Sequence, residues 1–514
     1  MKKRQGSITV FYSFSLLLTL VLFFCFLDVS RLVGQRNKAG ILSRETTMSC
    51  FGEYLRPIWD TYGVLTIDSC YCGEGALDLS LMEAVMEEYL AENASPALRG
   101  ENYYRLLTKE CAIQEYGLIT DQGGLPFLKE AALKQKSELP QQALEALGAQ
   151  KNPMEKDSNE GKDINQMIRD GQNAIEQARE EKKATEEKNA TGGKGKPPES
   201  VGKKGETKAD NAKGNAGEDV TVNPLDDLME LKNRGILAQV IPADEKVSEE
   251  KLGLNEPVSK RALAAGTTGE ESLSATEKIL FVDYEMTHFQ HYGADMQHPG
   301  LKYEWEYVIN GKKSDRANLS ATVEKLLLLR GAVNLGSLIK DPAKMAEVES
   351  LAMTLVGWTA NPAIIEATKA GLIATWSYVE SVLDVRSLLA GKKVALVKTP
   401  AEWTSQLLCL SAYFPVTVKA KECAKGIGYE EYLCTMSAMQ AQKTLGLRSL
   451  DLMENALHLQ EGYEQVRMDR CVYRMKVKFA YESQPIFYSI LSGMRRKFPL
   501  SHFQITGTIN YLTT

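Results

Sequence analysis

Three histidines lie close together in the sequence and are the first candidates for metal chemistry. His288, His291 and His298 have the spacing H-x2-H-x6-H. Imidazole nitrogen is a common metal ligand, and a predicted strand ending near His288 would bring the first two rings together. The region lacks H-E-x-x-H or an equivalent motif, and the neighbouring carboxylates have no recognised ligand spacing. We therefore interpret the three residues as loop or partner-surface histidines, with a metal site as the weaker alternative.

A pair of carboxylates occurs one turn apart in the longest predicted helix beyond the N-terminal region. Glu380 and Asp384 stand at i and i+4, which places both on one helix face where they could perform acid–base chemistry. The alternative is a structural polar stripe, in which Lys369 or Arg386 of the same helix neutralises the pair. The sequence contains no G-x-S-x-G, phosphate loop or dinucleotide fingerprint. We expect no cofactor and no enzyme activity, and we favour binding or assembly.

Nine cysteines are distributed around a long polar segment. Cys25 lies in an apolar N-terminal run, and the others form two sets of four. The set before the polar segment is Cys50, Cys70, Cys72 and Cys111, and the set after it is Cys409, Cys423, Cys434 and Cys471. Even sets fit disulfides formed outside the cell within each set, and buried free thiols are the alternative. The spacing Cys70-x-Cys72 is too tight for a usual zinc pair.

The most distinctive element of the sequence is an apolar run near the N-terminus. Lys2, Lys3 and Arg4 precede twenty uncharged residues, Ile8–Leu27, of which fourteen are Leu, Ile, Val or Phe. As a helix this run spans about 30 Å, so we predict a single transmembrane segment in contact with membrane lipid. A cleaved signal peptide would have a shorter apolar core and a small-residue cleavage site. The basic leader favours a cytoplasmic N-terminus and an extracellular C-terminal ectodomain at the cell membrane.

The overall composition is typical of an exported globular protein. Charged residues make up 25% of the chain, apolar residues make up 44%, and the net charge is −6. A protein that binds nucleic acid normally carries a basic face. The charge balance therefore disfavours a nucleic-acid partner.

Changes in composition divide the chain into five predicted parts. No aromatic residue occurs between Phe127 and Phe281, and the stretch 150–220 is rich in Lys, Glu, Gly and Asn, which predicts disorder. Within it, Gln172–Asn189 could form a solvated single helix. The parts are a cytoplasmic basic leader (1–6), a transmembrane helix (7–28), a stalk helix with an N-terminal ectodomain part (29–135), a low-complexity, mostly disordered insert (136–275) and an α+β ectodomain (276–514).

Hydrophobic periodicity predicts an α+β fold with a mainly antiparallel sheet. Strands are predicted near 58–65, 279–286, 303–309, 472–481 and 503–512, and Asn310-Gly311 signals a turn after the third. Helices are predicted at 79–92, 102–113, 318–338, 363–390, 430–445 and 450–460. The helix 363–390 has its polar residues on one stripe, so we expect it at the centre of the fold. The stalk helix is expected to end at Pro57.

Two groups of sequence strings resemble known families. Gly6-Ser7-Ile8-Thr9-Val10-Phe11, after a basic leader and before one long apolar helix, resembles the start of TadE/TadG-like pseudopilins of tight-adherence pilus systems. This resemblance implies processing between Gly6 and Ser7. A wider resemblance is to an uncharacterised family of Gram-positive, clostridia-type bacteria whose genes accompany such pilus loci. Its strings are Phe51-Gly52-Glu53-Tyr54, Trp59-Asp60-Thr61-Tyr62-Gly63, Leu329-Arg330 with Asn334, Asp341-Pro342-Ala343-Lys344, and Trp376 to Ser381 with Asp384, Arg386 and Gly391.

One departure from the pilin pattern refines the implied role. Pilins carry a glutamate five residues past the cleaved glycine, which offsets the N-terminal amine of a neighbouring subunit, and Phe11 occupies that position here. A filament-shaft subunit would leave the amine unpaired in an apolar core, at a cost of several kcal/mol. The resemblance implies a membrane-anchored surface assembly or adhesion component with a cap or initiation role. Its partners would be pilin or pseudopilin subunits and the pilus assembly platform. The alternative is an anchored extracytoplasmic enzyme or sensor with an unmarked site that could use a metal.

Overall fold

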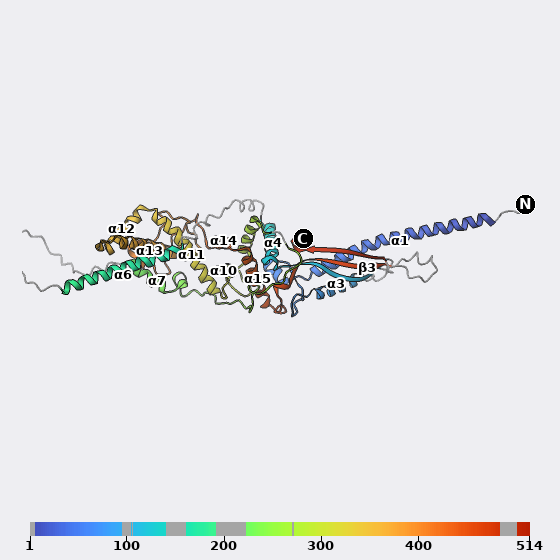
Figure 1. Ribbon diagram of the computed structural model, residues 1–514, viewed down its shortest axis with the longest axis horizontal. Coiled ribbons are helices and arrows are strands. Elements are labelled where there is room, and N and C mark those ends of the chain that lie inside the picture. Colours follow the sequence, from blue (N-terminus) through green and yellow to red (C-terminus); the bar gives the residue numbers. More distant parts are fainter. Residues whose placement is uncertain are drawn as a thin grey trace, which may run out of the picture.

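The molecule is elongated, and one helix projects from its end. The computed structural model describes residues 6–94, 104, 106–139, 161–191, 223–269, 272–483 and 501–513. In Figure 1 the N-terminal helix α1 (Gly6–Phe51) runs alongside a small sheet, and a larger body of helices lies beyond it. Helices combined with an antiparallel sheet confirm the predicted α+β class.

Helix α1 has a bare half and a packed half. Between residues 8 and 27 its side chains are exposed or half-exposed, whereas burial recurs at about one-turn intervals from Arg31 onward, at Gln35, Ala39 and Leu42 among others. This packed half is the predicted stalk, and it lies against α3 (Leu79–Ala94) and the sheet. The predicted helix 79–92 is therefore confirmed as α3.

The sheet is antiparallel and is built from both ends of the chain. Its strands are β1 (Ile67–Asp68), β2 (Leu106–Leu118), β3 (Cys471–Ser483) and β4 (Ser501–Asn510). Strand β3 is central, with β2 on one edge and β1 and β4 one after the other along the opposite edge. Alternate residues of β3, including Met475, Val477 and Phe479, are buried in the same cluster as residues of α1 and α3. The two C-terminal strands match predictions 472–481 and 503–512.

Because β2 precedes the insert and β3 follows it, the regions on either side of the insert share one sheet. The two predicted cysteine sets therefore do not lie in two separately packed regions. The predicted helix at 102–113 is also wrong, since β2 occupies 106–118. Its residues pair with β3 along nearly their whole length, and this long-range pairing prevails over a weak helical pattern.

Three predicted strands are helices. The segment 58–65 begins as α2 (Arg56–Tyr62), and Pro57 stands in its first turn, where a missing N–H removes no helical hydrogen bond. Helix α1 therefore ends at Phe51, before Pro57 is reached. Segment 279–286 lies in α9 (Ala275–His288), which begins with a complete capping box between Ser274 and Glu277.

Segment 303–309 lies in α10 (Glu304–Asn310), and the Asn310-Gly311 pair ends this helix. Gly311 has φ +63°, the left-handed conformation of a helix C-cap, and its N–H donates to Tyr307 O at 2.6 Å. The turn signal was therefore genuine, but it belongs to a helix end and not to a hairpin.

The helical body surrounds α13 (Pro362–Leu389), as predicted. Asn361 caps this helix, Pro362 opens it, and most side chains from Leu372 to Leu388 are buried. The predicted helix 430–445 is two helices, α14 (Tyr429–Ala438) and α15 (Gln442–His458). The other elements of the body are α4 (Asp121–Glu138), α11 (Asp315–Ile339) and α12 (Pro342–Val356), with short 3-10 turns η1 (Gly357–Thr359), η2 (Leu407–Tyr413), η3 (Met468–Arg470) and η4 (Tyr511–Thr513).

Part of the predicted insert belongs to the core. It forms α6 (Gly161–Thr191), α7 (Pro224–Asn233) and α8 (Ile236–Val240), and α6 lies along α13. A Cβ added at Gly171 of α6 would lie 2.6 Å from the Gly371 Cα of α13, so the two backbones meet closely there. The predicted solvated helix is thus packed on one side, and the described residues of 136–275 include these helices. The predictions for 140–160 and 192–222 lie outside the described residues.

Candidate functional site

The three candidate histidines have separate local partners. The ring of His288 stacks on Tyr284 with 4.2 Å between ring centroids, and its burial lowers the pKa of the imidazole. His291 Nε2 lies 3.6 Å from a Glu430 oxygen, and His298 Nδ1 lies 2.8 Å from Glu304 Oε2. In the part of the chain that the structure describes, no three His, Cys, Asp or Glu side chains are grouped so that they could hold a metal ion. The three histidines therefore lie in one region, but their rings do not converge on a common position where a metal ion could bind.

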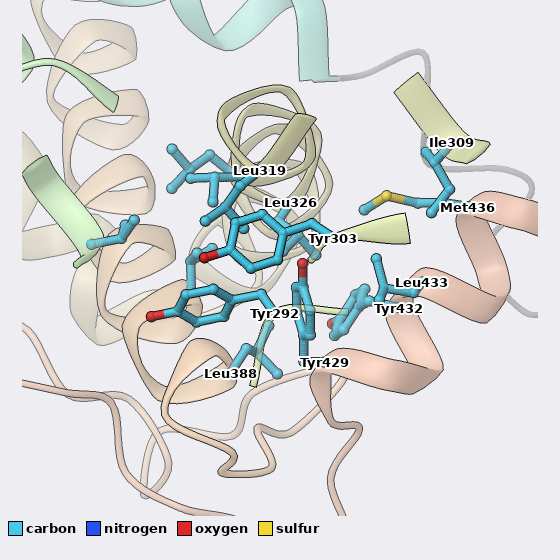
Figure 2. Packing of buried hydrophobic residues seen from close by; sticks show 14 of the residues in the cluster. Tyr292, Tyr303, Ile309, Leu319, Leu326, Leu388, Tyr429, Tyr432, Leu433 and Met436 are labelled. Carbon is cyan, nitrogen blue, oxygen red and sulfur yellow. The ribbon is translucent and has the colours of Figure 1, made fainter. Parts of the chain in front are cut away.

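The histidines lie beside buried carboxylates that sequence reasoning missed. Glu304 Oε1 accepts a hydrogen bond from Tyr62 Oη at 2.8 Å, and Glu306 Oε1 accepts one from Tyr429 Oη at 2.7 Å. Burial raises the pKa of Glu306, because a charged carboxylate loses its hydration there. Figure 2 shows Tyr429 close to Tyr292, whose backbone N–H also donates to Glu306.

A cavity of about 430 Å³ opens next to this cluster, between the end of α13 and the start of α14. Tyr292 and Tyr429 line it, whereas Glu306 behind them does not. Its charged lining residues are largely paired with each other: Lys393 Nζ lies 3.0 Å from Glu431 Oε1, and His291 approaches Glu430. The arrangement offers polar contacts but brings no acid–base pair to a common reacting position.

The second candidate pair, Glu380 and Asp384, lies in a closed ionic network at the centre of the body. Asp384 Oδ2 accepts hydrogen bonds from Arg330 Nε at 2.9 Å and Arg330 Nη2 at 2.8 Å, and Asp384 Oδ1 lies 2.6 Å from Lys398 Nζ. Glu380 also binds Lys398, and its Oε2 accepts from Ser405 Oγ at 2.6 Å. Two cations thus face two carboxylates, and the network is neutral.

The partners of this pair differ from the predicted ones. Lys369 pairs with Glu349 and Glu366 at the exposed end of α13. Arg386 donates instead to backbone carbonyls, among them Gln239 O and Tyr413 O at 2.7 Å each, and burial beside Arg234 lowers its pKa to about 10. Lys369 and Arg386 share the helix with the pair, whereas the actual partners, Arg330 and Lys398, lie on α11 and in the segment after α13.

The network is positioned for stability and not for substrate contact. The side chains of Arg330, Glu380 and Asp384 have no exposed area, and that of Lys398 is 1% exposed. Burial alone would raise the pKa of Asp384, but the charges of Arg330 and Lys398 hold that pKa below its ordinary value. The stripe interpretation of this pair fits the geometry better than acid–base chemistry. Arg330, Asn334, Glu380, Ser381 and Asp384 all come from strings that the resemblance singled out.

All nine cysteines lie among the described residues, and all are free thiols in this structure. The two predicted sets also do not form two clusters. Cys471, placed in the second set, stands opposite Asp68 in the sheet and so lies close in register to Cys70 of the first set. Burial raises the pKa of Cys471 well above its ordinary value and that of Cys111 to about 12, so both are protonated at neutral pH.

The apolar half of α1 is the most extensive exposed apolar feature of the described residues. Phe11 is 70% exposed and Phe26 is 74% exposed, although the helix around them has no charged residue from 8 to 27. It is the one described helix long and apolar enough to cross a membrane. This fits a single-pass membrane anchor near the N-terminus. Gly6, the candidate processing residue, is the first residue of α1, and Ser7 follows in the same helix.

Comparisons with known proteins identify one family. Neither the curated proteins nor the solved structures contain a match to this chain. Residues 214–483, more than half of the 514 residues, match a family described as "Family of unknown function (DUF5702)". The match begins before α7 and ends with β3, so it includes the ionic network, the buried carboxylates and the central strand of the sheet. The chain therefore belongs to the DUF5702 family.

Proposed function

We propose that the protein is a membrane-anchored assembly or adhesion component of the cell surface that acts without catalysis. The observation that carries this proposal is the continuity of α1, which is one helix from Gly6 to Phe51. Its first half is bare and apolar, and its second half is fastened to the sheet by side-chain hydrogen bonds. Ser43 Oγ lies 2.7 Å from Tyr481 Oη, and Ser483 Oγ donates to Gln35 Oε1 at 2.6 Å.

This construction joins the membrane to the ectodomain without a flexible linker. A helix rises 1.5 Å per residue, so the part of α1 beyond residue 27 extends roughly 36 Å from the bilayer core. An element of this kind can hold the helical body at a fixed distance from the membrane and pass a pulling or docking force to it. The neutralised interior carboxylates support a role in assembly better than a role in catalysis.

We further propose that this anchor serves a tight-adherence-type pilus, with the N-terminus cytoplasmic and the ectodomain outside. The basic leader, the Gly6-Ser7 junction and the single long helix support this placement. Phe11 supports a cap or initiation role, because a subunit without the acid cannot neutralise a neighbour's amine inside a filament shaft. Pilin or pseudopilin subunits and the assembly platform are then the partners.

Topology can be tested with the protein's own thiols. Cys409 and Cys423 are half-exposed in the ectodomain, so a membrane-impermeant maleimide should label both on intact cells. Because processing would remove the leader, the cytoplasmic probe is Lys3→Cys combined with Gly6→Leu, which blocks cleavage, and its thiol should be labelled only after the membrane is permeabilised. Mass spectrometry of the tryptic peptides assigns each label. The opposite pattern would show that the ectodomain faces the cytoplasm.

The cap or initiation role predicts where the protein stands on a pilus. A prepilin peptidase should leave Ser7 as the new N-terminus, and immunogold label should appear at filament ends or at the cell base. The Phe11→Glu variant restores the missing carboxylate and should allow label along the shaft. Deleting the gene should lower the number of pili. Uniform labelling of shafts by the unaltered protein would refute the cap role, and an intact Met1 on extracted protein would leave an unprocessed anchor.

A further inference from the structure

A second cavity lies just beyond the end of α1, where the stalk meets the helical body. Its volume is about 640 Å³, which is within the range of small-ligand sites. Four aromatic residues line it together with three acids and one arginine. They are Tyr54, Trp59, Tyr71 and Tyr463, with Glu53, Asp60, Asp68 and Arg56. Five of the lining residues come from the strings 51–54 and 59–63, and none of these five takes part in the sites described above.

Trp59 offers an aromatic face that the fold holds in place. Its side chain stands on α2 and is 40% exposed. The ring meets Tyr54 edge-on, with 6.2 Å between centroids, and Lys134 Nζ covers one face of the indole at 5.2 Å from the ring centroid. Lys134 does not line the cavity, so the face available for stacking is the one that Lys134 does not cover. An oriented indole that keeps part of its surface in solvent is well suited to stack against a ligand.

The cavity is also lined by a tight loop whose backbone is held in an uncommon conformation. Tyr71 and Cys72 have φ values of +49° and +65°, a region that side chains other than glycine rarely adopt. The Cys72 N–H donates to Asp68 Oδ2 at 2.8 Å, and Arg470 donates to both oxygens of Asp68 at 2.6 and 2.8 Å. Arg470 also binds Gly73 O at 2.7 Å. Backbone strain maintained in this way is concentrated at ligand sites.

The charges of the cavity indicate the class of ligand. Asp68 is neutralised by Arg470, and Arg56 lies 3.5 Å from Asp60 on the exposed rim. Among the described residues, Glu53 is then the lining carboxylate that has no ion pair with a cationic side chain. Glu53 accepts a hydrogen bond from Tyr89 Oη. The lining therefore combines aromatic faces with planar polar groups and a slight negative charge, which disfavours an anion.

We propose that this cavity binds a neutral saccharide, such as a hexose or N-acetylhexosamine unit. The C–H face of a pyranose ring would stack on Trp59, and its hydroxyl groups would bond to the carboxylates and guanidinium at the rim. A purely apolar chain would leave these polar groups unpaired. The inference does not depend on the pilus proposal, because it rests on the cavity alone.

The test uses the full chain in lipid nanodiscs, which avoid sugar-based detergents. Calorimetry and tryptophan fluorescence would follow titration with tetrasaccharides of N-acetylglucosamine or glucose, with oligogalacturonate and tetramethylammonium as the acidic and cationic probes. At least one neutral tetrasaccharide should bind. Trp59→Ala should weaken that binding about tenfold or more, the effect of losing one stacked face. Glu53→Gln, which keeps the side-chain shape, gives a second variant that should weaken it.

The matched control is Trp358→Ala, since Trp358 is 48% exposed on η1 and does not line the cavity. It should leave binding unchanged. Binding to purified cell-wall sacculi that Trp59→Ala abolishes would also support the proposal and would assign the ligand to a polymer. Equal binding by the two tryptophan variants, tighter binding of oligogalacturonate or tetramethylammonium, or no binding of any neutral saccharide would overturn it.

Discussion

Replacing Asp384 with asparagine should lower the free energy of unfolding by about 3–5 kcal/mol, the usual cost of breaking a buried ion pair by removing one partner. The substitution keeps the side-chain volume but leaves Arg330 and Lys398 opposite a single carboxylate, that of Glu380. None of these groups can reach water to recover its hydration. Chemical unfolding of the full chain, followed by tryptophan fluorescence because Trp376 and Trp403 lie in the same body, would measure the loss.

The control is Glu366→Gln on the same helix. This carboxylate is 73% exposed and pairs with Lys369 at 3.0 Å, so the change should alter stability by less than about 0.5 kcal/mol. The double variant Asp384→Asn with Lys398→Gln should cost less than the sum of its single changes, by about 1 kcal/mol or more, because it removes one charge of each sign. A loss for Asp384→Asn no larger than that of the control would show that the network does not hold the body together.

The parts of the fold that could be predicted are those whose signals are local. Three local signals predict helix α13. They are Asn361 and Pro362 at its start, Gly391 after its end, and the apolar periodicity between them. The apolar half of α1 is equally evident, since it depends only on composition. Both predictions needed no knowledge of what the helices contact.

The wrong secondary-structure predictions concern short segments and segments whose pairing partners are distant in the sequence. In α9 and α10 the runs of aromatic and β-branched residues are too short for periodicity to separate a helix from a strand. The capping box Ser274-x-x-Glu277 was present in the sequence and could have settled α9. No local signal could have identified β2, because it is a strand only through its pairing with β3, more than 350 residues away.

In the candidate site, too, the residues with a local sequence signal could be predicted, and those that depend on distant contacts could not. Glu380 and Asp384 were found because their spacing is local, but their partner Arg330 is 54 residues from Asp384 and comes from another helix. The buried acids Glu285 and Glu306 gave no signal, since acidic residues in a predicted strand or loop are expected to face solvent. Only the tertiary structure shows that they are enclosed.

Glu285 should make the stability of the protein depend on pH. Both of its oxygens are buried, and the nearby donors Trp305 Nε1 and Ser437 Oγ bond to each other at 3.1 Å. Burial raises the pKa of Glu285 to about 8, against roughly 4.3 in an unfolded chain. The folded state therefore holds an extra proton between these two values. The stability contributed by this group is complete below the unfolded pKa and is lost as the pH rises toward about 8.

The variant Glu285→Gln cannot ionise and should remove this dependence. Its stability relative to the unaltered protein should improve between pH 5 and pH 8 by about 1 kcal/mol per pH unit and then level off. Glu366→Gln, which removes an exposed carboxylate from the same body, is the control, and its effect on stability should stay below about 0.5 kcal/mol. Glu130→Gln provides a second case, because burial also raises the pKa of Glu130 to about 8 while its Oε1 accepts from Leu65 N–H at 2.6 Å. Glutamine can keep that bond, so this variant should reproduce the trend with a smaller loss at pH 5.

Parallel stability curves for Glu285→Gln and the unaltered protein would contradict this prediction. They would mean that the Glu285 carboxylate is already ionised when buried. The contact between α9, α10 and α14 would then need a cation to neutralise it.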